Sequence, residues 1–380
     1  MNRKLHLILA FMAATLFVGI MAVPSMAATV VEGPTPIFEG AATADNDLTM
    51  YNDKIALSFA VGTNNYWNMT RGSVLDIGIN DGQNNFKQDL TNDSEFLLDL
   101  WTSTGSYKGE NLLTDVDAKY SVDGDTAKVV MKTRYWVADA DKNGKDDEKE
   151  YGTVQKPLNV TTTYTLKDGD SFVTMVTTVE NPAGNKVTYK NMYSGYSIST
   201  NAASMYGPFG FYPEVKTTGI AVGANEKVQE RFGEFVATYS DSYTASVQMD
   251  DADSYKGSSG YKDVYKLRNI APGHTEKYTG ELLVSDKSET ASIISRYIAR
   301  ENIKDASKLS GTVTDDSGKP VAGAYIIVEK TGVYMPTEKS QSVNGQAVGT
   351  PVANMMPFVW TRTDENGKYS FDLPNTGWND

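Results

Sequence analysis

The sequence predicts an all-β protein in which a large antiparallel β-sandwich is followed by a second, smaller β-sandwich, with two short helices. Three observations predict it. Over residues 52–285, short runs rich in Val, Thr, Tyr and Phe alternate with Gly, Asn and Asp turns, the pattern of strands joined by hairpins. Helical spacing interrupts these runs at two places. After Lys308 the strand pattern starts again, with its own Gly and Pro turns.

The first 27 residues are predicted to be a secretory signal peptide. A basic start at Arg3 and Lys4 precedes an apolar run over residues 7–23 and small residues at Ser25 and Ala27, which fits cleavage after Ala27. The alternative, a membrane anchor, requires a longer run and a basic stop-transfer cluster. No other stretch is long and apolar enough to span a bilayer. We therefore expect a mature chain without a membrane span that is secreted, periplasmic or at the cell surface.

Residues 28–51 are expected to form an N-terminal linker and residues 52–285 the large sandwich. Strand-like runs occur, for example, at residues 54–61, 127–136 and 160–166. Asp-Gly pairs at 123–124 and 168–169 supply the positive φ that tight hairpins need. These pairs favour antiparallel neighbours joined by short turns.

Two segments have helical spacing. In residues 92–101, Asn92 as a cap with Glu95 three residues later precedes apolar residues on one helix face. In residues 286–302, Ile293, Ile294 and Ile298 share one face in the same way. We expect residues 286–308 to contain a connecting helix that packs on the sandwich.

The composition excludes several chemistries. The formal net charge is -13, and without a basic stripe nucleic acid is not expected as a partner. The chain has no cysteine, which excludes disulfides, thiolate metal sites and cysteine nucleophiles. His274 is the single histidine after the signal segment, so multi-histidine metal sites are excluded too. No catalytic residue is identified, although a carboxylate pair for glycoside hydrolysis stays open.

Residues 309–380 carry the pattern G-x-V-x-D-x-x-G-x-P-V-x-G-A at 311–324 and T-D-E-N-G-x-Y-x-F at 363–371. These motifs closely resemble carboxypeptidase regulatory-like domains, which are transthyretin-like β-sandwiches. The resemblance implies a structural or interaction module without catalytic residues of its own. The pattern stops before the closing strands of that family. We therefore expect a truncated domain, or one that is completed from elsewhere.

The larger region, on the runs 160–166, 172–181 and 270–278, loosely resembles the galactose-mutarotase-type supersandwich of carbohydrate-active enzymes and their accessory domains. The resemblance implies the fold of an antiparallel β-supersandwich, and a fold does not carry an activity with it. Similar β regions can precede a PHP-type metallohydrolase domain in secreted bacterial proteins. The histidine-rich motifs of that domain are absent from this sequence.

Residues 139–150 match the calcium-loop pattern D-x-[DN]-x-[DN]-G-x5-E at every required position. The oxygen ligands that this spacing offers to Ca²⁺ are Asp139, Asp141, Asn143, the Lys145 carbonyl, Asp147 through water and a bidentate Glu150. The flanking segments 135–137 and 151–154 resemble strands, so we expect a loop between two strands without the helix pair of an EF-hand. A structural Ca²⁺ is expected, and no other cofactor. The alternative is a solvated acidic hairpin tip.

Aromatic residues of the Gly- and Pro-rich segment 205–213 are candidates for stacking on sugars: Tyr206, Phe209, Phe211 and Tyr212. The alternative is ordinary packing in a sandwich core. His274, in a turn before a strand, is either a general base or a solvated surface residue.

Together these features favour a secreted, non-catalytic binding or scaffold protein, associated with carbohydrate or with an envelope component. The first alternative is a carbohydrate-active lyase or hydrolase that uses carboxylates and tyrosines. The second is the accessory N-terminal region of a secreted metallohydrolase whose catalytic domain is not in this chain. The sequence favours a chain that is not itself an enzyme.

Overall fold

The computed structural model describes most of the chain outside its first 26 residues. The described residues are 27–63, 72–87, 89–91, 93–98, 114–135, 137–152, 156–199, 235–239, 243–252, 254–258, 261–287, 289–331, 342–343, 346–347 and 355–375. The segment predicted as a signal peptide lies outside them, apart from Ala27.

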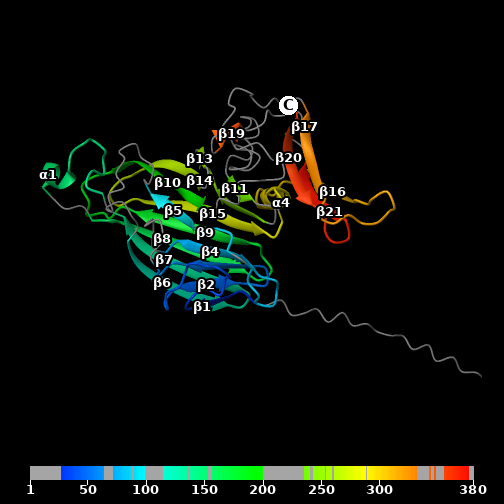
Figure 1. Cartoon of the computed structure of the whole chain (residues 1–380). Coiled ribbons are helices and arrows are strands. Elements are labelled where there is room, and N and C mark those ends of the chain that lie inside the picture. Colours follow the sequence, from blue (N-terminus) through cyan, green and yellow to red (C-terminus); the bar gives the residue numbers. More distant parts are fainter. Residues whose placement is uncertain are drawn as a thin grey trace, which may run out of the picture.

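Two large antiparallel sheets form the body of the protein (Figure 1). In spatial order, the eight-stranded sheet contains β1 (Thr29–Glu32), β2 (Leu48–Tyr51), β3 (Ile55–Phe59), β4 (Val74–Ile79), β5 (Asp93–Leu98), β10 (Tyr189–Ser199), β14 (Tyr261–Ile270) and β13 (Ser254–Ser258). The seven-stranded sheet contains β11 (Phe235–Tyr239), β12 (Thr244–Met249), β15 (Thr275–Ser285), β9 (Phe172–Glu180), β8 (Leu158–Lys167), β7 (Thr126–Tyr135) and β6 (Thr114–Asp123). The predicted large antiparallel sandwich is confirmed.

The alternating sequence of the central strands explains how the two sheets meet. Along β7, β8 and β9 every second residue is buried, because successive side chains of a strand point to opposite faces. Rings from the two sheets meet between them: the ring centroid of Phe59 in β3 lies 4.8 Å from that of Tyr164 in β8, and the centroid of Phe96 in β5 lies 5.1 Å from that of Tyr278 in β15. Most of the buried apolar residues described in the sandwich belong to one cluster, and Ala42, Ala60 and Leu75 form a small separate one.

The predicted hairpins form where the Asp-Gly pairs stand. Gly124 has φ 59° in the turn between β6 and β7, and Gly169 has φ 72° between β8 and β9. Glycine adopts this backbone conformation without steric cost. The register Asp123↔Thr126 closes the first hairpin with two residues.

Two sequence-based expectations are corrected. The segment 92–101 is not a helix: its described part forms β5, because Phe96 and Leu98 are buried in the core while the strand pairs with six residues of β10. This tertiary pairing outweighs the local helical spacing. The segment 28–51 is not only a linker, since β1 and β2 lie within it. Asp47 fixes this segment, because its carboxylate accepts hydrogen bonds from three consecutive backbone N–H groups, 61–63.

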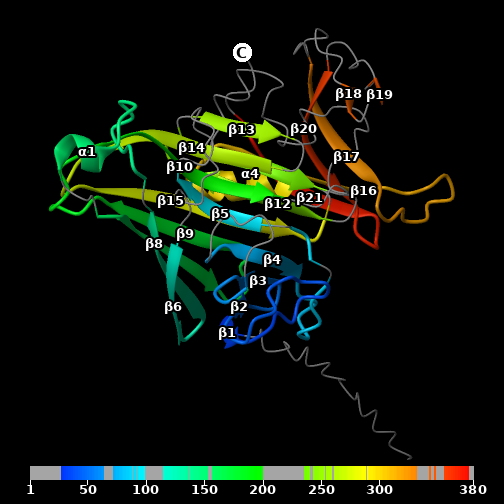
Figure 2. The same ribbon diagram turned by 60° about the vertical axis from the view of Figure 1, so that its left-hand side comes forward.

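The expected connecting helix is α4 (Ala291–Arg300), with Ile293 and Ile294 buried. Beyond it lie three two-stranded sheets: β16 (Ala306–Thr312) with β21 (Lys368–Pro374), β17 (Tyr325–Thr331) with β20 (Met355–Arg362), and β18 (Ser342–Val343) with β19 (Gln346–Ala347). Figure 2 shows the C-terminal strands grouped at one end of the sandwich. The Thr290 N–H donates to the Trp360 carbonyl at 3.0 Å, which joins these strands to the start of α4.

The second helix is not where the sequence predicts it. A short helix, α1 (Asp147–Tyr151), follows the acidic loop between β7 and β8. Neither helix in the described part of the chain has the length and hydropathy needed to span a membrane.

Candidate metal centre

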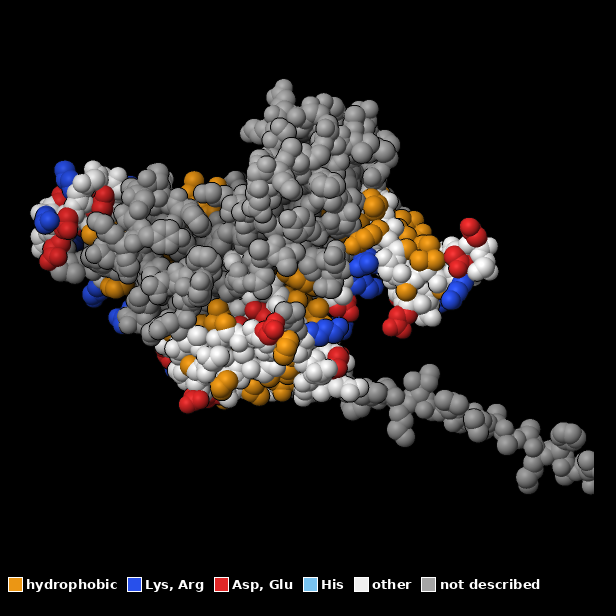
Figure 3. Space-filling model, viewed as in Figure 1, with side chains coloured by type: hydrophobic (Ala, Val, Ile, Leu, Met, Phe, Trp, Pro, Cys, Tyr) orange, Lys and Arg blue, Asp and Glu red, His pale blue; other side chains and the backbone are white. Residues whose placement is uncertain are grey.

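The acidic loop lies between β7 and β8, at the end of the sandwich opposite the C-terminal strands (Figure 1). Charged side chains of both signs gather at this end of the molecule (Figure 3). The loop therefore lies away from the interface between the sandwich and the C-terminal strands.

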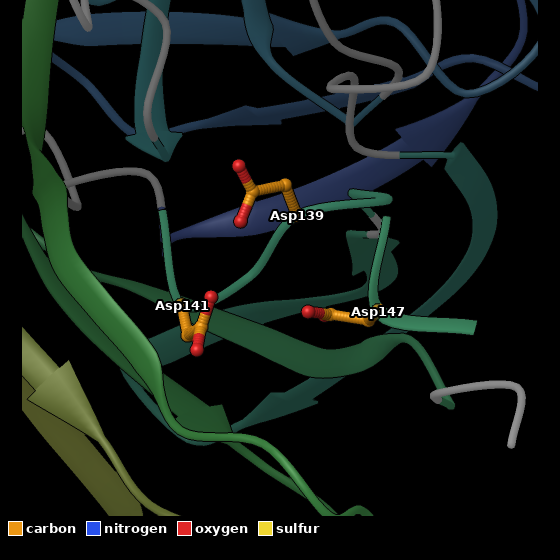
Figure 4. A group of neighbouring side chains, drawn as sticks. All are labelled: Asp139, Asp141 and Asp147. Carbon is orange, nitrogen blue, oxygen red and sulfur yellow. The ribbon is translucent and has the colours of Figure 1, made fainter. Parts of the chain in front are cut away.

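Three of the predicted ligands converge in this loop. Asp139, Asp141 and Asp147 each place one carboxylate oxygen within 4.8 Å of the oxygens of the other two. Figure 4 shows the three side chains arranged around one shared space. Oxygen atoms at this spacing can contact one hard divalent cation, which Ca²⁺ satisfies with six to eight oxygens at 2.3–2.6 Å.

The backbone already wraps around the first two carboxylates. Asp139 accepts hydrogen bonds from the Asn143 N–H at 3.0 Å and from the Gly144 N–H at 2.9 Å. Asp141 accepts a second contact from the Asn143 N–H at 3.1 Å. Gly144 has φ 86°, a left-handed conformation that favours glycine. The carboxylates are thus positioned by the loop itself before a cation arrives.

Asp147 is the buried member of the cluster. It is 2% exposed, and its Oδ2 accepts from the Ala140 N–H at 3.0 Å while its own N–H donates to the Ala138 carbonyl at 2.8 Å. The sequence pattern predicts that this residue binds through water. In the structure its carboxylate instead faces Asp139 and Asp141 directly.

The flank that follows the loop differs from the expected strand. Asp146 caps α1, because its carboxylate accepts from the Lys149 N–H at 3.1 Å. Gly152 ends the helix with φ 63°. Of the preceding flank 135–137, Tyr135 is the last residue of strand β7, and Val137 is not in a strand. The loop thus joins a strand to one short helix, and no helix pair is present in this described segment.

Glu150 is turned toward side chains of the loop and is not part of the three-carboxylate cluster. Its carboxylate accepts from Asn143 Nδ2 at 2.8 Å and from Lys145 Nζ at 3.1 Å. The hydrogen bond from Asn143, and then the one from Lys145, hold the pKa of Glu150 below its usual value. Lys145 therefore binds the carboxylate of Glu150, which in the calcium-loop pattern would bind the cation.

The loop also ties the two large sheets together. The Lys190 N–H, in β10 of the eight-stranded sheet, donates to the Ala140 carbonyl at 2.9 Å. Lys142 Nζ donates to the Asn191 carbonyl at 2.8 Å, and Lys190 Nζ lies 3.7 Å from Asp141 Oδ2. A cation in this loop would be attached to both sheets through these bonds.

The remaining candidate residues are placed as follows. The aromatic candidates Tyr206, Phe209, Phe211 and Tyr212 lie outside the described residues. His274 is exposed in the turn before β15, where its carbonyl accepts from the Asn181 N–H at 2.9 Å. The exposure of His274 agrees with the alternative that it is a solvated surface residue.

Sequence reasoning missed two neighbouring acids at the eight-stranded sheet, one buried in β4 and one half-buried in the connection between β4 and β5. Asp76 of β4 is fully buried, and its two oxygens accept from the backbone N–H groups of Ala41 and Ala42 at 2.6 and 3.1 Å. Burial, and then the charge of Asp76, raise the pKa of nearby Asp89 to about 8. An acid inside the apolar run 74–79 is the sequence signal for this pair. Its oxygens bind backbone groups, which indicates a structural role.

No protein-family model matches the chain, and no curated protein sequence matches it either. Solved structures align with the chain at low identity and low TM-score. An α-mannosidase from Enterococcus faecalis is 11% identical with a TM-score of 0.42, over 83% of this chain and 42% of that one. A putative aldose 1-epimerase from Escherichia coli is 9% identical with a TM-score of 0.34, over 61% and 96%. A heparan sulfate lyase from Pedobacter heparinus is 10% identical with a TM-score of 0.33, over 88% and 42%.

The chain spans less than half the length of the mannosidase and of the lyase. Similarity at these identities and scores does not transfer an activity or a site. The residues of the chain itself must carry any functional argument.

Proposed function

We propose that the chain is an exported, calcium-stabilised β-sandwich protein that binds or scaffolds a carbohydrate or another envelope component and is not itself an enzyme. The observation that carries the proposal is the convergence of Asp139, Asp141 and Asp147 within 4.8 Å in a loop that matches the calcium pattern. A cation lowers the repulsion between these three carboxylates and completes their coordination.

A bound Ca²⁺ would stabilise the connection between the sheets. It competes with Lys145 for Glu150, and binding requires Glu150 and the Asn143 side chain to turn toward the cluster. A ligand that binds the folded chain stabilises it by about 2.7 kcal/mol at a concentration one hundred times its dissociation constant. The expected role is therefore structural, without the moving helix pair of a calcium sensor.

Calcium titration of the full chain tests this proposal. We expect one binding event by calorimetry and a higher unfolding temperature in Ca²⁺ than in chelator. The double variant Asp139→Asn/Glu150→Gln should lose both effects. Glu148→Gln is the matched control, because this exposed acid of α1 lies outside the predicted ligand set. Negligible heats and unchanged unfolding temperatures for all three proteins would overturn the calcium role.

An aromatic area on the eight-stranded sheet supports the carbohydrate part of the proposal. Tyr193 of β10 and Tyr265 of β14 stack with ring centroids 4.0 Å apart, and Leu267, paired with Tyr193 across the strands, is 51% exposed. Tyr193 is buried and Tyr265 is half-buried, so Leu267 and part of Tyr265 form the accessible part of this area. Aromatic and apolar lining is a common part of small-molecule binding sites.

A glycan array tests the carbohydrate partner. We expect binding that Tyr265→Ala weakens and that Tyr120→Ala, at an exposed tyrosine on β6, leaves unchanged. Release of shorter sugars from bound glycans would show an enzyme and contradict the scaffold role. Absence of binding to any glycan would remove carbohydrate as the partner.

A further inference from the structure

A cleft of about 550 Å³ lies among the C-terminal strands. Its lining comes from β16, β20 and β21, and Lys287 reaches it from the segment between β15 and α4. The cleft thus brings together parts of the β16–β21 sheet, the β17–β20 sheet and the segment that leaves the sandwich after β15. In Figure 3, Lys and Arg side chains gather where the C-terminal strands meet the sandwich.

The charge of this cleft is opposite to that of the chain. Lys287, Arg362 and Lys368 line it together with one acid, Asp364, although the chain as a whole carries a formal charge of -13. The Oδ1 of Asp364 accepts from the backbone N–H groups of Asn366 and Lys368 at 2.8 and 2.9 Å, which fixes it in the turn before β21. Clustered cations in an acidic protein favour an anionic ligand.

One of the three cations is held in position, and the backbone of a second is anchored. Arg362 Nε donates to the Gly323 carbonyl at 3.1 Å, and the guanidinium carbon lies 4.6 Å from the centre of the Tyr325 ring. The backbone of Lys287 is fixed because its carbonyl accepts from Thr244 Oγ1 at 3.0 Å. Groups that are already oriented lose less conformational entropy when a ligand binds.

Tyr369 adds an aromatic side to the cleft. A Cβ atom on Gly311 would lie 2.6 Å from the Tyr369 hydroxyl oxygen and 2.8 Å from its ring carbons. The ring therefore lies directly against the Gly311 backbone, a close approach that requires glycine. Ser310, Thr312 and Ser370 supply hydroxyl groups along the same cleft.

We propose that this cleft binds an acidic saccharide, a sugar that carries carboxylate or sulfate groups. The cations bind the acidic groups through charge-assisted hydrogen bonds. The hydroxyls and the Tyr369 ring contact the sugar ring. The inference rests on the proposed binding function, for which it names the ligand class and the place, and it is independent of the calcium loop.

The test measures binding of three probes to the full chain by calorimetry: an oligogalacturonate, a neutral oligosaccharide of equal length, and sodium sulfate at matched ionic strength. We expect the oligogalacturonate to bind and the neutral sugar not to bind. The double variant Lys287→Gln/Lys368→Gln should weaken binding by about a hundredfold, since each of the two charge-assisted bonds contributes about tenfold, or about 1.4 kcal/mol. Lys308→Gln, at an exposed lysine of β16 outside the cleft, is the matched control.

Gly311→Ala gives a second, uncharged perturbation, because it pushes the Tyr369 ring from its place. We expect it to weaken oligogalacturonate binding while circular dichroism shows an unchanged fold. Equal affinities of the wild type and the double lysine variant, or absence of oligogalacturonate binding, would overturn the inference. Binding of sulfate without the oligosaccharide would overturn the saccharide part as well.

The two proposals fail in different ways. If the calcium titration is negative while oligogalacturonate still binds, the calcium role is refuted and the cleft proposal is supported. If the glycan array detects only neutral glycans and the lysine variants bind them as the wild type does, the cleft proposal falls and the binding function stands.

Discussion

Replacing Asp89 by asparagine should change how the stability of the protein depends on pH. The Asp89 carboxylate accepts from the Ile77 N–H at 2.9 Å and from the Thr91 N–H at 3.3 Å, close to the buried Asp76. Burial, followed by the charge of Asp76, raises its pKa from 3.8 to about 8. An amide keeps the accepting oxygen for both N–H groups and removes the charge.

The size of the effect follows from proton linkage. The folded chain holds a proton on Asp89 up to about pH 8, whereas the unfolded chain releases it near pH 4. The contribution of Asp89 to the free energy of unfolding is therefore fully present below pH 4 and is lost as pH rises to about 8. Four pH units at about 1.4 kcal/mol each give an upper bound of about 6 kcal/mol. Because the side chain keeps partial contact with water, we expect about 2 to 3 kcal/mol.

The assay is urea unfolding followed by far-UV circular dichroism between pH 5 and 9. Relative to the wild type, Asp89→Asn should gain stability as pH rises from 5 to about 8, and the difference should level off above that. Asp81→Asn is the control from the same connection: the Gln83 N–H lowers the pKa of Asp81, so this acid is ionised in both states throughout. A free-energy difference between Asp89→Asn and the wild type that does not change with pH would refute the reasoning.

Three further predictions concern buried polar groups and close packing, and urea unfolding checks each of them. Arg296→Met should destabilise the fold by about 3 kcal/mol, because it removes the bidentate partner of the buried Glu281; a Glu281→Met/Arg296→Met double variant should recover most of the loss. Gly280→Ala should cost about 3 kcal/mol or more, since the new Cβ would clash with the backbone oxygen of Gln248 and with the Tyr196 ring. Asn181→Ala should cost about 2 kcal/mol, because two buried backbone carbonyls lose their donor.

Local patterns predict the fold well where neighbours in sequence are also neighbours in space. The hairpins at Gly124 and Gly169 follow from Asp-Gly pairs, since the turn and both strands lie within about twenty residues. The segment at Phe96 could not be predicted in this way. Its helical spacing is real, but its strand partner in β10 is about one hundred residues away, and pairing at that distance leaves no local signal.

The acids Asp76 and Asp89 were likewise not predictable from local sequence. Asp76 and Asp89 lie 13 positions apart, and Asp76 is held by N–H groups of residues 41 and 42. A single acid in an apolar strand indicates a structural or functional role. It does not reveal which backbone groups it binds, because those groups come from a segment that the sequence presents as a linker.

The calcium loop shows how far a motif determines a site. The pattern fixes the ligand types and places Asp139 and Asp141 on one turn, because the spacing of two residues and the glycine at 144 impose the wrapped backbone. The pattern allows any residue at position 145, so it does not predict that Lys145 competes with the cation for Glu150. Calcium affinity should therefore rise when Lys145 becomes glutamine, since the cation then displaces a neutral amide instead of a charge. A calorimetric titration of Lys145→Gln beside the wild type measures this, and an unchanged or weaker affinity would show that the ion pair does not oppose binding.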